Sequence, residues 1–188
     1  LTNSKAVGIR PYRILLFVLV VITNIFRAVP FIILLIFLIP FTRLLVGTSI
    51  GVKGAVVPLI FGAVPFFTRQ VETALADVNP GKIEAARAMG SSTCGIVFRI
   101  YLHEAVPDLI RVITITAISL IGLTTSAGAV GAGGIGSFAI NYGQNLHYQD
   151  IVNLCVILLL IVVSLIQLIG NCLSKAAVNR GLFTSSKA

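Results

Sequence analysis

Histidine and cysteine are the side chains of this sequence best suited to covalent or metal chemistry, and there are few of them. The histidines, His103 and His147, each lack a partner at the spacing of a metal site. The cysteines, Cys94, Cys155 and Cys172, show no paired spacing, so we interpret them as free thiols that pack as small apolar groups. An intramembrane hydrolase would need a serine and a base at the same depth, but both histidines flank the apolar segments. The sequence therefore predicts no catalytic residue and no metal site.

A glycine-rich run at residues 128–136 resembles a phosphate-binding loop only superficially. The nucleotide-binding pattern G-x4-G-K-[ST] needs a lysine that contacts the phosphates. No lysine follows this run, and the pattern is absent from the sequence. We therefore expect no nucleotide site in this chain. We interpret the run as a close-packing or flexible segment at the end of an apolar span.

Isolated charges within apolar stretches are the remaining candidates for a functional role. Arg27 lies inside a long apolar stretch, and a central arginine costs about 2.5–3.5 kcal/mol on membrane-insertion scales. Two interpretations of Arg27 stay open: it lines a functional path, or it is buried against a backbone carbonyl. Arg69 and Glu72 are spaced to pair across one helical turn. Arg111 lies near a span end, where its side chain can reach the interface.

The composition identifies the protein class. Of 188 residues, 57% are hydrophobic and 11% are charged, and the mean hydropathy is +1.04. Soluble domains contain about 25% charged residues, so this is an integral membrane protein. The net charge is +8, but the 14 lysines and arginines are scattered singly, which argues against nucleic-acid binding and fits membrane topology.

Four stretches are long and apolar enough to cross a bilayer, which takes about 20 residues. They are residues 14–40, 54–76, 109–128 and 151–174. We predict one all-α, polytopic membrane domain over residues 1–188. Pro30, Pro58 and Pro65 lie within these spans, and we expect kinks there. Because the sequence starts at Leu1 and its one methionine is Met89, we also expect a further segment before residue 1.

Lysine and arginine are unevenly distributed among the connecting segments. They occur before the first span, in residues 41–53 and 77–108 and in the tail, but not in residues 129–150. The positive-inside rule then places residues 77–108 and both ends in the cytoplasm and the glycine-rich loop outside.

Residues 77–108 form the one long cytoplasmic loop of this topology. Asn79 and Pro80 are typical of a helix start, and the glutamate at position 84 suits a first turn. Gly90 should end this helix at positive φ, and Ser91 or Ser92 should cap a second one. In the second helix one apolar face is expected, made by Ile96, Val97, Ile100 and Tyr101.

Small side chains in the first of these helices allow a close approach by another surface. They are Ala85, Ala86 and Ala88. A docking site for a partner, a solvated connector and a membrane-surface segment all fit such a helix pair, and the residues alone leave these three alternatives open.

The spacing within this loop resembles a family motif. It is similar to the pattern EAA-x3-G-x9-I-x-L-P of permeases in ABC importers. The matching residues are Glu84-Ala85-Ala86, three residues including Met89, then Gly90, nine residues, and Ile100-Tyr101-Leu102. His103 replaces the final proline, and Pro107 lies four residues further on, where it can stop or bend the chain. Three other runs resemble the methionine-importer permeases: NIFRAVPFIILL at 24–35, IPFTR with VGTSIG at 39–51, and GAVGAGGIG at 128–136.

The resemblance implies a permease with five spans and an external N-terminus in the bacterial cytoplasmic (inner) membrane. It implies a homodimer, two cytoplasmic ATPase subunits that bind ATP and Mg, and an external methionine-binding lipoprotein. Residues 77–108 would be the ATPase-coupling loop, and alternating access would move L- and D-methionine or close derivatives. The C-terminus would be cytoplasmic. Permeation of another small amino acid or organic solute, and an ATP-independent channel or carrier, remain alternatives. No substrate-binding residue follows from the sequence.

Overall fold

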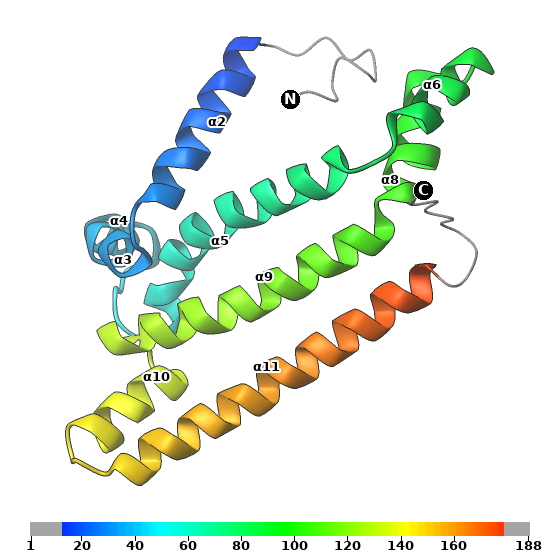
Figure 1. Cartoon of the computed structure of the whole chain (residues 1–188). Helices are drawn as coiled ribbons and strands as arrows, with labels where there is room; N and C mark the ends of the chain where they lie inside the picture. The colour runs from blue at the N-terminus through cyan, green and yellow to red at the C-terminus, as the bar shows by residue number, and fades with distance from the viewer. Residues whose placement is uncertain (1–12, 179–188) are drawn as a thin grey trace.

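The computed structural model describes residues 13–178, and within this range the chain is helical and contains no strand. The long helices are α2 (Arg13–Ala28), α5 (Gly51–Ala76), α9 (Val106–Ala127) and α11 (Gln149–Ala177). α9 packs between α5 and α11, and α2 packs against α5 (Figure 1). The predicted all-α, polytopic membrane fold is confirmed.

Shorter helical elements connect the long helices. They are α3 (Phe31–Phe37), α4 (Ile39–Val46), α6 (Pro80–Ala88), α7 (Thr93–Gly95), η1 (Ile96–Tyr101), α8 (Leu102–Glu104), η2 (Gly128–Ala132), α10 (Gly134–Phe138) and η3 (Ala139–Gln144). Figure 1 shows α6 to α8 beyond one end of the long helices, near the end of α11, while α3, α4 and α10 lie towards the opposite end.

Within the described range, three helices are long and apolar enough to span a membrane: Gly51–Ala76, Val106–Ala132 and Gln149–Ala177. They contain the predicted spans 54–76, 109–128 and 151–174. Only 6% of the most apolar window of α11 is buried within the chain. Its apolar side chains therefore face outward, as expected of a helix that contacts lipid or another subunit.

The predicted span over residues 14–40 is not one continuous helix. α2 ends at Ala28, and the helical segments Phe17–Ala28 and Phe31–Phe37 meet at an angle of 105°. Pro30 causes the break, because it has no N–H to donate and disfavours a helical conformation at the residue before it. From Pro30 the chain turns into α3, whose Leu34 and Leu35 are buried. If the bent pair counts as one span, residues 13–178 contain four spans.

Proline has a milder effect in α5. Pro58 and Pro65 are both buried, yet α5 runs unbroken from Gly51 to Ala76. Neighbouring helices can stabilise a proline-containing span by packing around the ring. The hydroxyls of Thr68 and Thr73 in the same helix donate to the carbonyls of Val64 and Arg69.

The glycine-rich run forms a tight reversal between α9 and α10. Gly131 has φ of +89°, a conformation that favours glycine. After the turn, α10 packs directly against α9. The two backbones are so close that a Cβ on Gly136 would overlap the carbonyl oxygen of Thr125. A Cβ on Gly128 would similarly meet the backbone of Ser137. The interpretation of residues 128–136 as a close-packing segment is confirmed.

Candidate functional site

The first helix of the predicted coupling loop starts and ends where its sequence indicates, but the expected first-turn position of Glu84 is wrong, because Glu84 lies beyond the first turn. The Asn79 side chain accepts a hydrogen bond from the Gly81 N–H at 2.9 Å and caps α6, with Pro80 at its first position. α6 ends at Ala88, and Gly90 has φ of +77°. Ser92, rather than Ser91, caps the second helix by accepting from the Gly95 N–H at 3.2 Å. The predicted pair of short helices joined at Gly90 is confirmed.

The second helix contains a widened turn. Ile96–Tyr101 form a π-helical segment, in which hydrogen bonds join residues i and i+5. This winding brings Ile96 and Tyr101, which are five residues apart, close to one face, and both side chains are buried. Val97 and Ile100 are partly buried beside them, so the predicted apolar face is confirmed.

The two helices enclose an apolar core of their own. Its buried members are Val78, Ile83, Ala86, Ile96, Tyr101 and Ala105. Leu75 at the end of α5 and Leu109 at the start of α9 pack against this core. The loop is therefore a compact unit whose core continues into two of the spans.

The two alanines of the Glu-Ala-Ala motif occupy different environments. Ala86 is 1% exposed and lies inside the loop core, while Ala85 is exposed. Successive helical residues point about 100° apart, so the two alanines face different directions. The prediction of a small surface that a partner can approach is therefore wrong for Ala86. Ala86 is small because the two loop helices approach each other closely there.

An ion pair joins the two ends of the loop. Lys82 Nζ in α6 lies 2.6 Å from Glu104 Oε1 in α8, and the Glu104 side chain is only 19% exposed. A partly exposed pair of this kind contributes on the order of 1 kcal/mol. The pair links α6 to α8, the last helical segment before α9.

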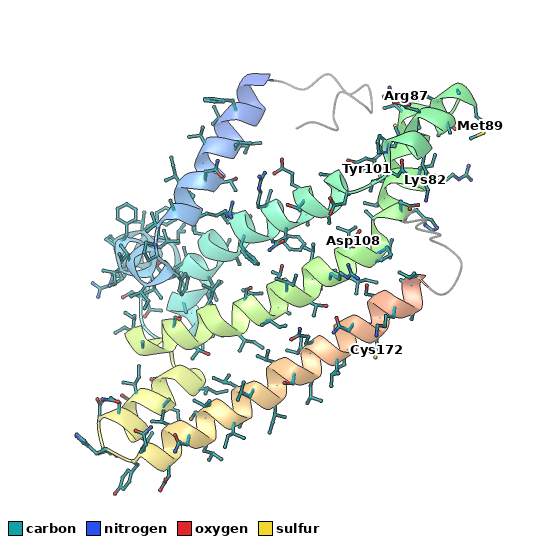
Figure 2. The ribbon with its side chains drawn as sticks, viewed as in Figure 1. Lys82, Arg87, Met89, Tyr101, Asp108 and Cys172 are labelled. Carbon is teal, nitrogen blue, oxygen red and sulfur yellow. The ribbon has the colours of Figure 1, made fainter. Side chains whose placement is uncertain are left out.

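Several of the exposed side chains of the loop are apolar. Met89 is 78% exposed, Phe98 71% and Leu102 42%. Figure 2 shows Met89 projecting from the far end of the loop. Glu84 and Ala85 are exposed too, and Ile100 is partly buried. Phe98 was not among the predicted loop residues, although its position four residues before Leu102 is a signal that both share a helix face.

The loop joins α9 at a bend. Ala105 separates α8 from α9, which starts at Val106 with Pro107 in its first turn. Proline in a first turn loses no helical hydrogen bond, but it prevents the preceding helix from continuing. Pro107 thus supplies the bend near the position where His103 replaces the family proline.

The remaining ion pairs and thiols lie on the long helices, except Cys94 in α7 of the loop. Arg69 pairs with Glu72 at 2.6 Å, as expected, and Arg111 lies 3.5 Å from Asp108. Cys155 is buried, whereas Cys94 and Cys172 are exposed, and all three are free thiols. Within residues 13–178, no group of three or more His, Cys, Asp or Glu side chains could hold a metal ion.

A cavity of about 340 Å³ lies between the glycine-rich reversal and the long helices. Its walls are mainly apolar and come from α5, α9, α11 and residues 132–135. Thr124 and Thr125 supply hydroxyl groups, and both hydroxyls donate to the carbonyl of Ile121. The described residues that line this cavity include no charged side chain.

Known proteins with similar sequences are bacterial permeases. The Methionine import system permease protein MetP of Bacillus subtilis (strain 168) is 44% identical over 158 residues, which are 84% of this chain and 71% of that protein. The Probable D-methionine transport system permease protein MetI of Pasteurella multocida (strain Pm70) is 47% identical over 84% of this chain and 73% of its own length.

Solved structures show the same fold. A structure titled "Inward facing conformations of the MetNI methionine ABC transporter: CY5 native crystal form" matches with a TM-score of 0.82 and 47% identity, over 87% of this chain and 76% of that chain. The corresponding SeMet soak crystal form matches with a TM-score of 0.79 and 48% identity, over 84% of this chain and 73% of that chain. The family described as "Binding-protein-dependent transport system inner membrane component" matches residues 6–180, and the chain belongs to that family.

Proposed function

We propose that this chain is the membrane-spanning subunit of an ATP-driven importer that moves methionine across the bacterial cytoplasmic membrane. The similarity to MetP and MetI carries the proposal, because it covers more than 70% of each relative at 44% and 47% identity. The structural match to the MetNI methionine ABC transporter supports the same substrate class. L- and D-methionine and close derivatives are the proposed solutes.

The coupling loop is the proposed docking site of a cytoplasmic ATPase. Its outward face offers Glu84, Ala85, Met89 and Phe98, a small and partly apolar surface suited to a groove. ATP and Mg bind to the partner in this proposal, since the chain has no Walker pattern. Closure of the ATPase around ATP would displace the loop.

The loop core explains how such a displacement reaches the membrane. Leu75 and Leu109 extend that core into α5 and α9, so the loop and the ends of these spans move together. Packed cores switch between discrete arrangements rather than deforming continuously. Rocking of α5 and α9 would then alternate the access of the pathway between the two sides.

Further partners belong to the same proposal. A second copy of the permease would cover part of the apolar surface of α3 and α4, where Phe37 is 75% exposed and Leu44 is 84% exposed. Membrane lipid would cover the outer faces of the spans. An external methionine-binding lipoprotein would deliver the solute at the side of the glycine-rich reversal.

Uptake measurements test the function directly. In cells without other methionine importers, the full-length protein, its ATPase and its binding lipoprotein should accumulate labelled L-methionine. Excess unlabelled D-methionine should compete, whereas leucine and glutamine should not. Uptake that persists with a hydrolysis-deficient ATPase would indicate a channel or carrier, and competition by another amino acid alone would identify a different substrate.

The orientation of the chain is a separate prediction. Residues 77–108 and the C-terminus should be cytoplasmic and residues 129–150 external, because lysine and arginine are absent from the latter. Single cysteines at the exposed positions Ser91 and Asn145, in a variant lacking Cys94, Cys155 and Cys172, report the two sides. In intact cells an impermeant thiol reagent should label position 145 and leave position 91 unlabelled until the cells are opened. The reverse pattern would invert the topology.

A further inference from the structure

Arg27 lies at the level of the middle of the spans. The ring of its neighbour Phe26 packs on the ring of Phe61 in α5, with centroids 5.2 Å apart. At 1.5 Å per helical residue, Phe61 is about 15 Å along α5 from Gly51 and about 22 Å from Ala76. The apolar core of a bilayer is about 30 Å thick. Arg27 in the last turn of α2 is therefore within membrane depth, next to the 105° break that precedes α3.

The chain supplies no carboxylate side chain at this depth. All six of its acidic residues lie within residues 13–178: Glu72, Asp77, Glu84, Glu104, Asp108 and Asp150. Every one is in the coupling loop or near the end of a long helix. Glu72, Glu104 and Asp108 form ion pairs with other cations. Arg27 is exposed on the surface of the chain, so its guanidinium is accessible to an anionic group from outside the described residues.

The surroundings of Arg27 provide groups of complementary kinds. Asn24 is exposed three residues earlier, so its amide lies on the same face of α2 as the guanidinium. The last carbonyls of a helix have no N–H partner within that helix, and Pro30 cannot supply one. Helix-terminal carbonyls attract cations. The break thus combines N–H donors for an anion with carbonyl acceptors for a cation.

An amino-acid zwitterion carries both of these charges. Guanidinium groups bind carboxylates through two parallel hydrogen bonds, and carbonyl groups accept from an ammonium. Among the described residues that line the cavity beside the glycine-rich reversal, the polar side chains are the hydroxyls of Thr124 and Thr125, so the cavity offers a carboxylate no cationic side chain. We propose that Arg27 binds the carboxylate of the amino acid in transit, with Asn24 as a second donor and the α2 terminal carbonyls facing the ammonium. This inference rests on the proposed transport of methionine.

Arginine removal with a matched control tests the assignment. In the assembled full-length transporter, Arg27→Gln should raise the KM for methionine uptake by about 10- to 100-fold, the loss expected for a charge-assisted hydrogen bond. Arg27→Lys should have a smaller effect, because lysine keeps the charge without the planar fork. Lys53→Gln removes an equivalent charge from the exposed first turn of α5 and should leave the KM unchanged.

Chemical restoration of the charge separates a role in binding from a role in assembly. The Arg27→Cys variant, which also lacks the three native cysteines, is treated after assembly with methanethiosulfonate reagents. The ethylammonium reagent should recover uptake, whereas the ethylsulfonate reagent should not. Methionine should slow the labelling. A thiol facing lipid should resist both reagents, because the reaction needs an ionised thiol.

Each outcome decides between the alternatives. If the native transporter takes up no methionine, the proposed function itself fails. If it does, and Arg27→Gln keeps the native KM, the assignment of Arg27 is overturned. If the Arg27→Gln transporter does not assemble, the KM of the Asn24→Ala transporter decides whether this face binds methionine. An unchanged KM in Asn24→Ala, together with labelling of the Arg27→Cys variant that methionine does not slow, would assign Arg27 to a contact between subunits.

Discussion

Gly136→Ala is expected to prevent the glycine-rich reversal from closing and to destabilise the whole permease. A Cβ at this position would overlap the Thr125 carbonyl, so α10 could stay helical only by moving away from α9. Overpacking typically costs 1–3 kcal/mol of stability. We expect a loss of about 3 kcal/mol or more here, because the Cβ would meet backbone atoms of Thr125, which cannot rotate away as a side chain can. A lower thermal midpoint in detergent and loss of the monodisperse species would record the effect.

Gly122→Ala is the matched control for this substitution. Gly122 lies in α9 itself, and a Cβ there meets no atom within 4 Å apart from its chain neighbours and the nearby backbone of its own helix. Alanine is favoured over glycine in a helix by about 1 kcal/mol, so this variant should equal or exceed the native stability. Equal stability of Gly136→Ala and Gly122→Ala would contradict the close approach of α10 to α9.

Ala85→Leu is expected to weaken ATPase association with little effect on the fold. Ala85 is exposed on the outer face of α6, so the added side chain points away from the loop core. If that face seats in a groove, the bulk should cost about 1–3 kcal/mol, or roughly 5- to 150-fold in affinity. Co-purification of the ATPase and ATP-driven methionine uptake measure the loss.

Leucine substitutions at two other alanines serve as comparisons for this result. Ala86→Leu adds the same bulk inside the loop core, where Ala86 is 1% exposed, and should lower thermal stability as well as ATPase binding. Ala176→Leu adds it at an exposed position near the end of α11, outside the loop, and should change neither property. Native ATPase binding by Ala85→Leu would show that this face of α6 is not the docking surface.

Local features of the loop were predictable from the sequence because each depends on neighbouring residues. Asn79 and Pro80 start α6, Gly90 takes a positive φ, and Ser92 caps the following helix. Each of these residues acts on backbone N–H or carbonyl groups that lie within four positions of it in the sequence. The apolar lengths of α5, α9 and α11 were equally predictable, since membrane thickness sets a minimum run of apolar residues.

The roles of individual loop side chains could not be predicted in the same way. Ala85 and Ala86 are chemically identical, and the motif groups them together. Their separation into an outer and a buried residue depends on where η1 packs, and η1 is itself widened into a π-helical turn. Phe98 was overlooked for the same reason, because its exposure follows from the face that Ile96 and Tyr101 bury.

The all-helical membrane class, the helix boundaries of the loop and the family motif were predictable from the sequence. Composition, apolar run length and capping act over short stretches, so no folded context is needed to interpret them. In contrast, the turn of 105° around Pro30 and the continuation of α5 through Pro58 and Pro65 became evident from the folded chain. Proline removes a backbone hydrogen bond at all three positions, but Pro58 and Pro65 are buried, where neighbouring helices can stabilise a continuous span, whereas Pro30 is exposed.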